Sequence, residues 1–577
     1  MAFDIQSESR SLWPGVPKLS LLSMSMLFIS APLYAQQTPN AGSLLKEQPK
    51  PFVQPTAPKS TVPTEPAVKA PAEQGPKILV KGFHIEGNLL IPEAELQAQI
   101  KDAIGKELSF AQLQALAFHL TGYYIHKGYL ARVVLPPQDV RDGIVTIRII
   151  EGKRGRVDVD AQGKRINADR VKGFAEANLP PQDAPLDLQV LDEAMALLNE
   201  QPGVDAKIAV ASGKEEGQIG LVITAKDKPL LESAVILNNQ GARGTGEYQA
   251  IGSLALNNPT GHFDAASLLL NASEGTAFVR GDYRIAIGNR GFQLGVNASH
   301  LDYKIVQSGL TALKPKGSAD TYGLTGSYPL ARRPDLNLTV SGGYDDKVLI
   351  DRTDAGETSH RHDTAINLGL GGYAQRFGAV FSFGAIVSSG NSDQRNAGAR
   401  AIDDATRKIQ GGFAKISYSL GYLRPLDDRW ALNAKLNGQS ASKNLDSSER
   451  MSLGGPNGVR AYPVGEANGD EAMIVSLDLV RKISDNVRMS VFVDHGTVLI
   501  NKETWANWDA GNPSMPNSYS LMGAGAGLDW RISPQILLTA SLATPVGRNP
   551  GRDASGNNAD GSPQSRLRGW LALNAQF

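Results

Sequence analysis

The sequence contains no cysteine in its 577 residues. This absence excludes disulfide bonds, thiol nucleophiles and Cys-based zinc sites together. Charge of one sign is not in excess either, because 58 Lys and Arg balance 58 Asp and Glu, so no net field favours a nucleic-acid partner. The chain also lacks an uncharged apolar run of the ~18 residues that a membrane-spanning helix needs. If this chain spans a membrane, it must do so as a closed β-barrel.

Motifs of enzymes and cofactor sites are missing as well. The sequence has no nucleophile elbow, no P-loop and no dinucleotide-binding glycine pattern after a strand. His360 and His362 flank Arg361 but have no matching carboxylate or histidine partners, so the sequence predicts no metal site. The paired carboxylates Asp403 and Asp404 lie in loop-like sequence, where we interpret them as solvated. We therefore predict neither an enzyme nor a cofactor-dependent protein.

Residues 1–35 have the layout of a secretory signal peptide. Arg10 and Lys18 precede an apolar stretch that is followed by small residues, with cleavage expected after Ala35. A buried helix or a membrane anchor is the alternative, but the apolar stretch is short and a polar segment follows it. Residues 36–76 are rich in Pro, Ala, Thr, Gln and Lys and bury too little apolar surface to fold. They predict a linker of polyproline character, with a Pro-rich docking ligand as the alternative.

Residues 77–152 and 153–228 predict two small α+β domains in tandem. Each shows the order strand, helix, helix, strand, strand, which makes the second an internal repeat of the first. In the first, Ser109 is the expected N-cap of a helix that reaches Lys127. In the second, the expected helices cover about 167–177 and 188–200.

Residues 229–577 predict a transmembrane antiparallel β-barrel, so the fold class is mainly β. Alternating segments of ~9 to 12 residues recur between Gly, Asn, Asp and Pro, and about sixteen such candidates are present. A soluble β-sandwich also alternates, but this stretch would be unusually long for one. The chain ends in RGWLALNAQF, in which apolar and small residues occupy one face and Phe577 is the terminal aromatic. This ending resembles the C-terminal assembly signal of bacterial outer-membrane barrels.

The segment GYLARVVLPPQDVRDGIVTIRIIEGK at the end of the first repeat resembles a POTRA domain of the TpsB family. TpsB proteins are the outer-membrane transporters of two-partner secretion, often called haemolysin secretion/activation proteins. The similarity covers both repeats and the barrel. Its distinctive residues are a PPQ turn and a closing Glu-Gly, namely Pro136, Pro137, Gln138, Glu151 and Gly152.

Two further motifs resemble the same family. The long segment 447–471 resembles a loop that folds back into the barrel lumen, and its tip is Val459-Arg460-Ala461-Tyr462, with alanine where the family has glycine. The segment Phe492-Val493-Asp494-His495-Gly496 resembles a Phe-x-Asp-x-Gly strand motif. The resemblance implies that Arg460 pairs with Asp494 inside the barrel and that Phe492 and Tyr462 pack beside the pair.

Strand alternation supports that pairing independently. In VRMSVFVDHG the side chains of Met489, Val491 and Val493 share one face, which suits lipid. Ser490, Phe492 and Asp494 share the other face, which suits the lumen. A confined luminal carboxylate favours a guanidinium, which can donate two parallel hydrogen bonds to it. A solvated loop arginine and an unrelated luminal aspartate are the alternative.

The resemblance implies a mechanism and partners. POTRA domains in the periplasm bind an unfolded TpsA-like exoprotein (adhesin, haemolysin or haem-scavenging), and the barrel exports it across the outer membrane. Outer-membrane lipid and, during insertion, the barrel-assembly machinery are the other partners; no nucleic acid and no cofactor are implied. Family members often carry an N-terminal helix in the pore, and here only residues around Ser43 to Gln48 have suitable sequence. A passive porin and a barrel-assembly factor are the alternative functions.

Overall fold

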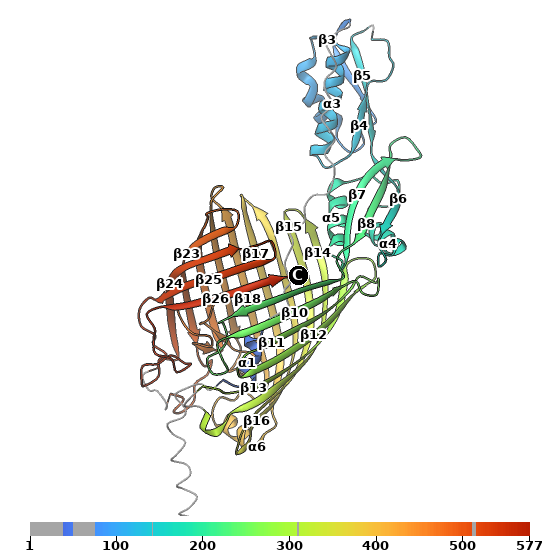
Figure 1. Cartoon of the computed structure of the whole chain (residues 1–577). Coiled ribbons are helices and arrows are strands. Elements are labelled where there is room, and N and C mark those ends of the chain that lie inside the picture. The colour runs from blue at the N-terminus through green and yellow to red at the C-terminus, as the bar shows by residue number, and fades with distance from the viewer. Residues whose placement is uncertain (1–38, 50–75, 141, 308–310, 510–514) are drawn as a thin grey trace, which may run out of the picture.

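The computed structural model describes residues 39–49, 76–140, 142–307, 311–509 and 515–577. The expected signal peptide, residues 1–35, and most of the expected linker lie outside these ranges. Figure 1 shows two small α+β units that lead into a large barrel. Within the described ranges, no helix combines the length and the apolar character needed to cross a membrane.

The main elements of the first α+β unit follow the predicted order of strand, helix, helix, strand and strand, and two short strands, β1 and β3, pair with each other in addition. Its helix α3 begins after Ser109, whose side chain accepts from the backbone of Gln112 while the Gln112 side chain accepts from the backbone of Ser109. Its three-stranded sheet has the order β2-β5-β4, with β2 parallel to β5. The elements are β1 Lys77–Leu79, β2 Gly82–Glu86, α2 Glu93–Ile100, the 3₁₀ turn Lys101–Ala103, β3 Glu107–Ser109, α3 Phe110–His126, β4 Ala131–Val134 and β5 Ile144–Glu151.

The second unit repeats this architecture. Its sheet has the order β6-β8-β7, so β7 is an edge strand, and helix α4 begins after the N-cap Asn167. Leu191, Ala194 and Leu198 lie on one face of α5 and are buried against the sheet. The elements are β6 Lys153–Gln162, α4 Ala168–Asn178, α5 Leu188–Asn199, β7 Val204–Ser212 and β8 Gln218–Asp227.

Sixteen antiparallel strands form a closed barrel, which confirms the predicted fold class. The ring closes where β26 pairs with β9, through the register Ala572–Gln576 against Ala234–Asn238. The barrel strands are β9 Leu231–Asn238, β10 Gln249–Asn257, β11 Asp264–Ala272, β12 Thr276–Ile287, β13 Phe292–Lys304, β14 Lys316–Arg333, β15 Leu336–Thr353, β16 Gly356–Arg376, β17 Ala379–Gln394, β18 Gly411–Pro425, β19 Trp430–Ala441, β22 Glu471–Lys482, β23 Val487–Leu499, β24 Ser518–Arg531, β25 Ile536–Pro545 and β26 Arg568–Gln576.

Three shorter elements lie between the barrel strands. They are the 3₁₀ turn Thr311–Leu313, helix α6 Ala397–Ala405 and the small hairpin of β20 Met451–Ser452 with β21 Asn468–Gly469. Alternation along the barrel strands follows the prediction for β23. Val491 is 58% exposed on the outer face, whereas Asp494 is fully buried on the inner face. The pleat of an antiparallel strand therefore separates a lipid-facing set from a luminal set.

The second α+β unit packs directly on the barrel rim (Figure 1). Phe263, in the turn between β10 and β11, enters the core of the unit and packs edge-on against Phe174 with 5.9 Å between ring centroids. Arg332, near the end of β14, donates through Nε to both carboxylate oxygens of Glu200 at 2.7 Å. An apolar insertion and a partly buried ion pair thus fix how the unit sits on the barrel.

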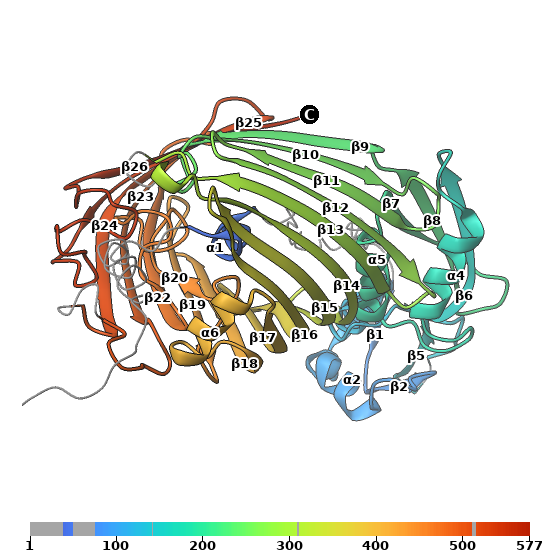
Figure 2. The same cartoon turned by 90° about the horizontal axis from the view of Figure 1, so that it is seen from below.

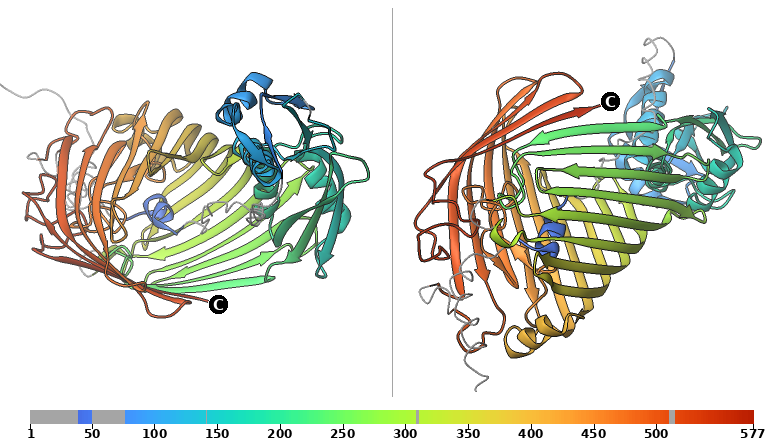
Figure 3. Two further views of the ribbon diagram at one scale, coloured as in Figure 1. Left: turned by 90° about the horizontal axis from the view of Figure 1, so that it is seen from above. Right: turned by 60° about the horizontal axis from the view of Figure 1, so that its bottom comes forward.

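The predicted linker contains a helix inside the barrel. Helix α1, Ala41–Glu47, lies in the lumen, as the views along the barrel show (Figures 2 and 3). Its Leu44 is buried against Leu301 and Leu349 of the barrel wall. Residues 36–76 are therefore not linker throughout. The helix overlaps the stretch around Ser43 to Gln48 that the sequence analysis named as suitable for a pore helix. Seven residues carry little periodic signal, and the wall supplies the apolar contacts that the helix lacks by itself.

Candidate functional site

A long loop folds from the rim into the barrel lumen. It joins β19 to β22 and so covers residues 442–470, rather than the predicted 447–471. We call it the luminal loop. Its tip and its root, the segment that directly follows β19, contact different parts of the barrel wall. The core of its folded tip combines loop residues such as Leu453, Val459 and Tyr462 with the wall residues Phe492 and Leu521.

The tip places Arg460 against two carboxylates of the wall. The guanidinium donates to Asp494 through Nε at 2.8 Å and through Nη2 at 2.7 Å, which is the bidentate arrangement. The backbone N–H of Arg460 also donates to Asp494 at 3.0 Å, and Nη1 donates to Asp478 of β22 at 2.9 Å. Asp478 did not figure in the sequence analysis. Alternation along β22 places its side chain on the luminal face, but its position opposite Phe492 depends on the strand register.

Aromatic side chains enclose the Arg460 contact. The guanidinium carbon lies 3.3 Å from the centroid of the Phe492 ring, a cation–π stacking distance. Trp570, on the last strand, donates from its indole to the Arg460 carbonyl at 2.8 Å. Tyr462 is buried in the apolar cluster next to Phe492. The loop tip therefore contacts three neighbouring parts of the wall, and water has little access to the charged pair.

Glycines on the wall make room for the loop tip. A Cβ on Gly496 would lie 3.0 Å from Val459, and a Cβ on Gly523 would lie 2.7 Å from the Ala461 methyl group. Ala461, which replaces the family glycine, lies outside the region of positive φ. Its methyl group fits because Gly523 has no side chain. The departure from the family pattern therefore causes neither backbone strain nor a clash.

At the root of the luminal loop the charges are reversed relative to the tip, because the loop supplies carboxylates and the barrel wall supplies cations. Asp446 and Glu449 are the loop partners here, and Arg361, Lys347 and Lys415 are the wall partners on β16, β15 and β18. Glu449 lies 2.6 Å from Lys415 and also contacts Lys347. Burial opposes ionisation of Glu449, but the two lysines outweigh it and hold its pKa at about 2.

The residues of the root escaped sequence reasoning. Arg361 was considered only as the residue between two histidines, and the acidic loop residues were not considered at all. Alternation along β16 places Arg361 on the luminal face, which was a usable signal. Nothing local identifies its partners, however, because Asp446 is 85 residues away along the chain.

The predicted POTRA residues support the first α+β unit and its joint with the second. Gln138 exchanges two hydrogen bonds with the backbone of Thr146 on β5, at 2.6 and 2.8 Å. Its side chain therefore extends the pairing along the edge of β5 that β4 occupies further on. Pro136 and Pro137 lead directly into Gln138. Glu151 accepts from the backbone of Leu89 and Leu90 and from the Tyr124 hydroxyl. These side chains bind within their own unit.

Gly152 lies at the joint between the two α+β units. A Cβ there would lie 2.5 Å from the Ile219 side chain and 2.7 Å from the Leu130 carbonyl, one on each side of the joint. The Gly152 carbonyl accepts from the backbone of Leu186 at 2.9 Å. A residue with a side chain would push the two units apart, so this glycine sets their close approach.

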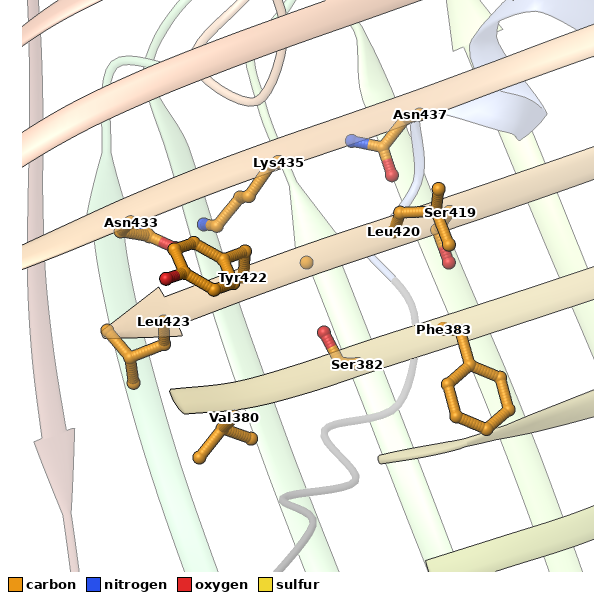
Figure 4. A pocket seen from close by; sticks show the side chains of 11 residues that line it. Val380, Ser382, Phe383, Ser419, Leu420, Tyr422, Leu423, Asn433, Lys435 and Asn437 are labelled. Atoms are coloured by element: carbon orange, nitrogen blue, oxygen red, sulfur yellow. The ribbon is translucent and has the colours of Figure 1, made fainter. Parts of the chain in front are cut away.

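Phe577 lies at the closing seam of the barrel. Its backbone exchanges hydrogen bonds with Ser233 of β9, at 2.8 and 3.1 Å, and its ring is 76% exposed. Another part of the inner wall carries polar side chains. A recess of about 380 Å³ is lined by luminal side chains of β17, β18 and β19 together with apolar neighbours (Figure 4). Its polar members are Ser382, Ser419, Asn433, Lys435 and Asn437. Such a lining suits a wet lumen.

These features define a class of protein: a barrel with tandem α+β units, a luminal loop and a luminal helix. The profile of the haemolysin secretion/activation protein family ShlB/FhaC/HecB matches residues 217–530, more than half of the chain, and the ShlB-type POTRA profile matches residues 78–152. The chain belongs to this family. It is an outer-membrane transporter of two-partner secretion with periplasmic POTRA domains, and its partner is a TpsA-like exoprotein.

Individual relatives agree with the family. The heme/hemopexin transporter protein HuxB of Haemophilus influenzae is 26% identical over 97% of this chain and 99% of its own length. The outer membrane transporter CdiB of Escherichia coli is 24% identical over 81% of this chain and 79% of its own length. The solved structure of CdiB from Escherichia coli has a TM-score of 0.63 at 22% identity and covers 90% of this chain and 93% of that chain. This last likeness is one of fold.

Proposed function

We propose that the POTRA domains capture the unfolded exoprotein and that the barrel conducts it once the luminal loop and helix α1 move aside. This proposal rests on the observation that the luminal loop and helix α1 occupy the lumen together (Figure 3). A barrel of this size encloses an aqueous channel that needs closing when idle. In this proposal Val459, Arg460, Tyr462, Phe492, Asp494 and Gly496 form the latch that holds the loop tip.

The edge strand β7 supports capture by strand addition. Asn199 exchanges hydrogen bonds of 2.7 and 2.9 Å with the backbone of Ala206, which shows that the backbone groups of alternate residues point outward from the sheet here. The backbone groups of Ile208, Val210 and Ser212 point outward in the same way. Residues 209–212 are exposed, so an extended chain can pair along this part of the edge.

The alternatives fit these features less well. A passive porin has no use for two POTRA domains or for a latch of several buried contacts. A barrel-assembly factor shares the fold, since BamA from Haemophilus ducreyi matches with a TM-score of 0.53, but at 17% identity that likeness shows the fold alone. We propose that no catalytic step takes part, because transport of an unfolded chain needs binding and a conduit but no nucleophile.

Co-expression with a candidate TpsA-like exoprotein tests the function. With the chain present, the exoprotein is expected in the culture medium; without it, the exoprotein remains in the periplasm. Immunoblots of medium and periplasmic fractions measure the distribution, and a cytosolic enzyme controls for lysis. Equal amounts in the medium with and without the chain contradict the proposal.

The end-to-end similarity to HuxB favours a haem-binding or hemopexin-binding exoprotein, since HuxB is named for heme and hemopexin. The exported product is expected to retain haem or hemopexin on an affinity resin, whereas a control fraction from cells that lack the chain is not. Retention is measured by haem absorbance and by hemopexin immunoblot. An exported product that binds neither excludes this class of partner.

A further inference from the structure

The root of the luminal loop brings together the loop, the barrel wall and helix α1 around one guanidinium. Arg361 of β16 lies 2.7 Å from Asp351 of the neighbouring strand β15 and 2.6 Å from Asp446 of the loop. It also donates to the Ser447 hydroxyl at 2.7 Å. Asp446 is fully buried, and burial and ion pairing act on it in opposite directions. Arg361 prevails and holds the pKa of Asp446 below its usual range.

Helix α1 and its N-cap Asn40 bind two of the three partners of Arg361. The backbone N–H of Ala41 donates to Asp351 at 2.8 Å, and the Ser447 hydroxyl donates to the Asn40 side chain at 2.8 Å. Gly42 lies so close to the loop that a Cβ there would meet the Ser447 oxygen at 2.4 Å. Helix α1 therefore bridges a wall residue and a loop residue that Arg361 already joins.

Three carboxylates gather around this contact. Asp351, Asp446 and Asp363 converge on it, with Asp363 accepting from the Ser448 hydroxyl at 3.2 Å. The Tyr303 hydroxyl donates to Asp351 at 2.6 Å but carries no charge. Without Arg361, the carboxylates of Asp351 and Asp446 would lose the cation that joins them in a buried setting, where repulsion is weakly screened. The seat of α1 would then lose the guanidinium that orients Asp351, which accepts from Ala41, and Ser447, which donates to Asn40.

We infer that Arg361 is a positioning residue that couples helix α1 to the luminal loop and thereby keeps the pore plugged. The Arg460 contact lies at the tip of the loop and makes none of the hydrogen bonds that seat α1. Because coupling is reciprocal, α1 docking and root attachment stabilise each other, and both must yield when the pore opens. The inference rests on the proposed opening of the pore, but its test measures the position of α1 and not export.

The cysteine-free sequence allows a direct test on the full-length chain in proteoliposomes. A Leu45→Cys parent carries one thiol on α1, half-buried in the seated position. A water-soluble maleimide then reports how often α1 leaves its seat. Gly42→Val in this parent is the released reference, because its side chain cannot fit beside Ser447. Asp494→Asn in the same parent disturbs only the tip of the loop.

Arg361→Gln is expected to raise the labelling rate at least tenfold, towards the Gly42→Val reference, and to open the channel in planar bilayers. Arg361→Lys is expected to give a labelling rate between those of the parent and of Arg361→Gln, because an ammonium lacks the planar fork that reaches both carboxylates. Asp494→Asn is expected to stay within twofold of the parent. If Arg361→Gln inserts poorly, Asp446→Asn breaks the same contact from the loop. Parental labelling in these root variants, or equal release by Asp494→Asn, overturns the inference.

Discussion

Arg460→Ala is expected to lower export at least tenfold while the barrel still inserts into the outer membrane. The substitution removes the guanidinium that pairs with Asp494 and Asp478, and Asp494 is fully buried. Breaking a buried pair from one side costs about 3–5 kcal/mol, which is enough to displace the loop tip. Exoprotein in the medium, normalised to transporter in the membrane, measures the effect.

Three controls separate a latch from a general defect. Retention of heat-modifiable migration shows that the barrel has folded. Arg460→Lys is expected to retain part of the activity, since it keeps the charge but loses the bidentate geometry. In the double variant with Asp494→Ala, the loss should be smaller than the product of the two single losses, because both remove one interaction. Export at the parental level in both single variants would remove the latch from the proposal.

Deletion of residues 78–227 is expected to abolish export, a fall of a hundredfold or more, while ion conductance survives. The deleted residues supply the β7 edge and both POTRA domains, but none of the sixteen barrel strands. Closure of the barrel depends on pairing between its own strands, which the deletion leaves intact. Export assays and single-channel recordings on the same variant separate the two functions.

The deletion needs a matched control because it exposes Phe263. This side chain is 1% exposed in the intact chain, where the second POTRA domain covers it. Phe263→Ser within the deletion keeps the rim polar, and it should improve solubility without restoring export. Substantial export by either deletion variant would favour a passive channel over POTRA-dependent capture.

Local sequence patterns determined most of the architecture of this chain. Period-two alternation set which face of β23 meets lipid, and capping residues such as Ser109 and Asn167 set where helices begin. These features depend on neighbours a few residues away. The Arg460 and Asp494 contact was also anticipated, but through a family resemblance combined with the luminal phase of the strand.

Only the tertiary structure decided which contacts hold the elements that fill the lumen. The path of the luminal loop brings Asp446 to Arg361 and places Arg460 against Asp478 as well as Asp494. Helix α1 lies hundreds of residues away along the sequence from the Asp351 and Ser447 side chains that seat it. Alternation states that a side chain points inward, but it does not state which strand or loop lies opposite. That choice depends on strand register, on barrel closure and on the burial of charges that are tolerable only in pairs.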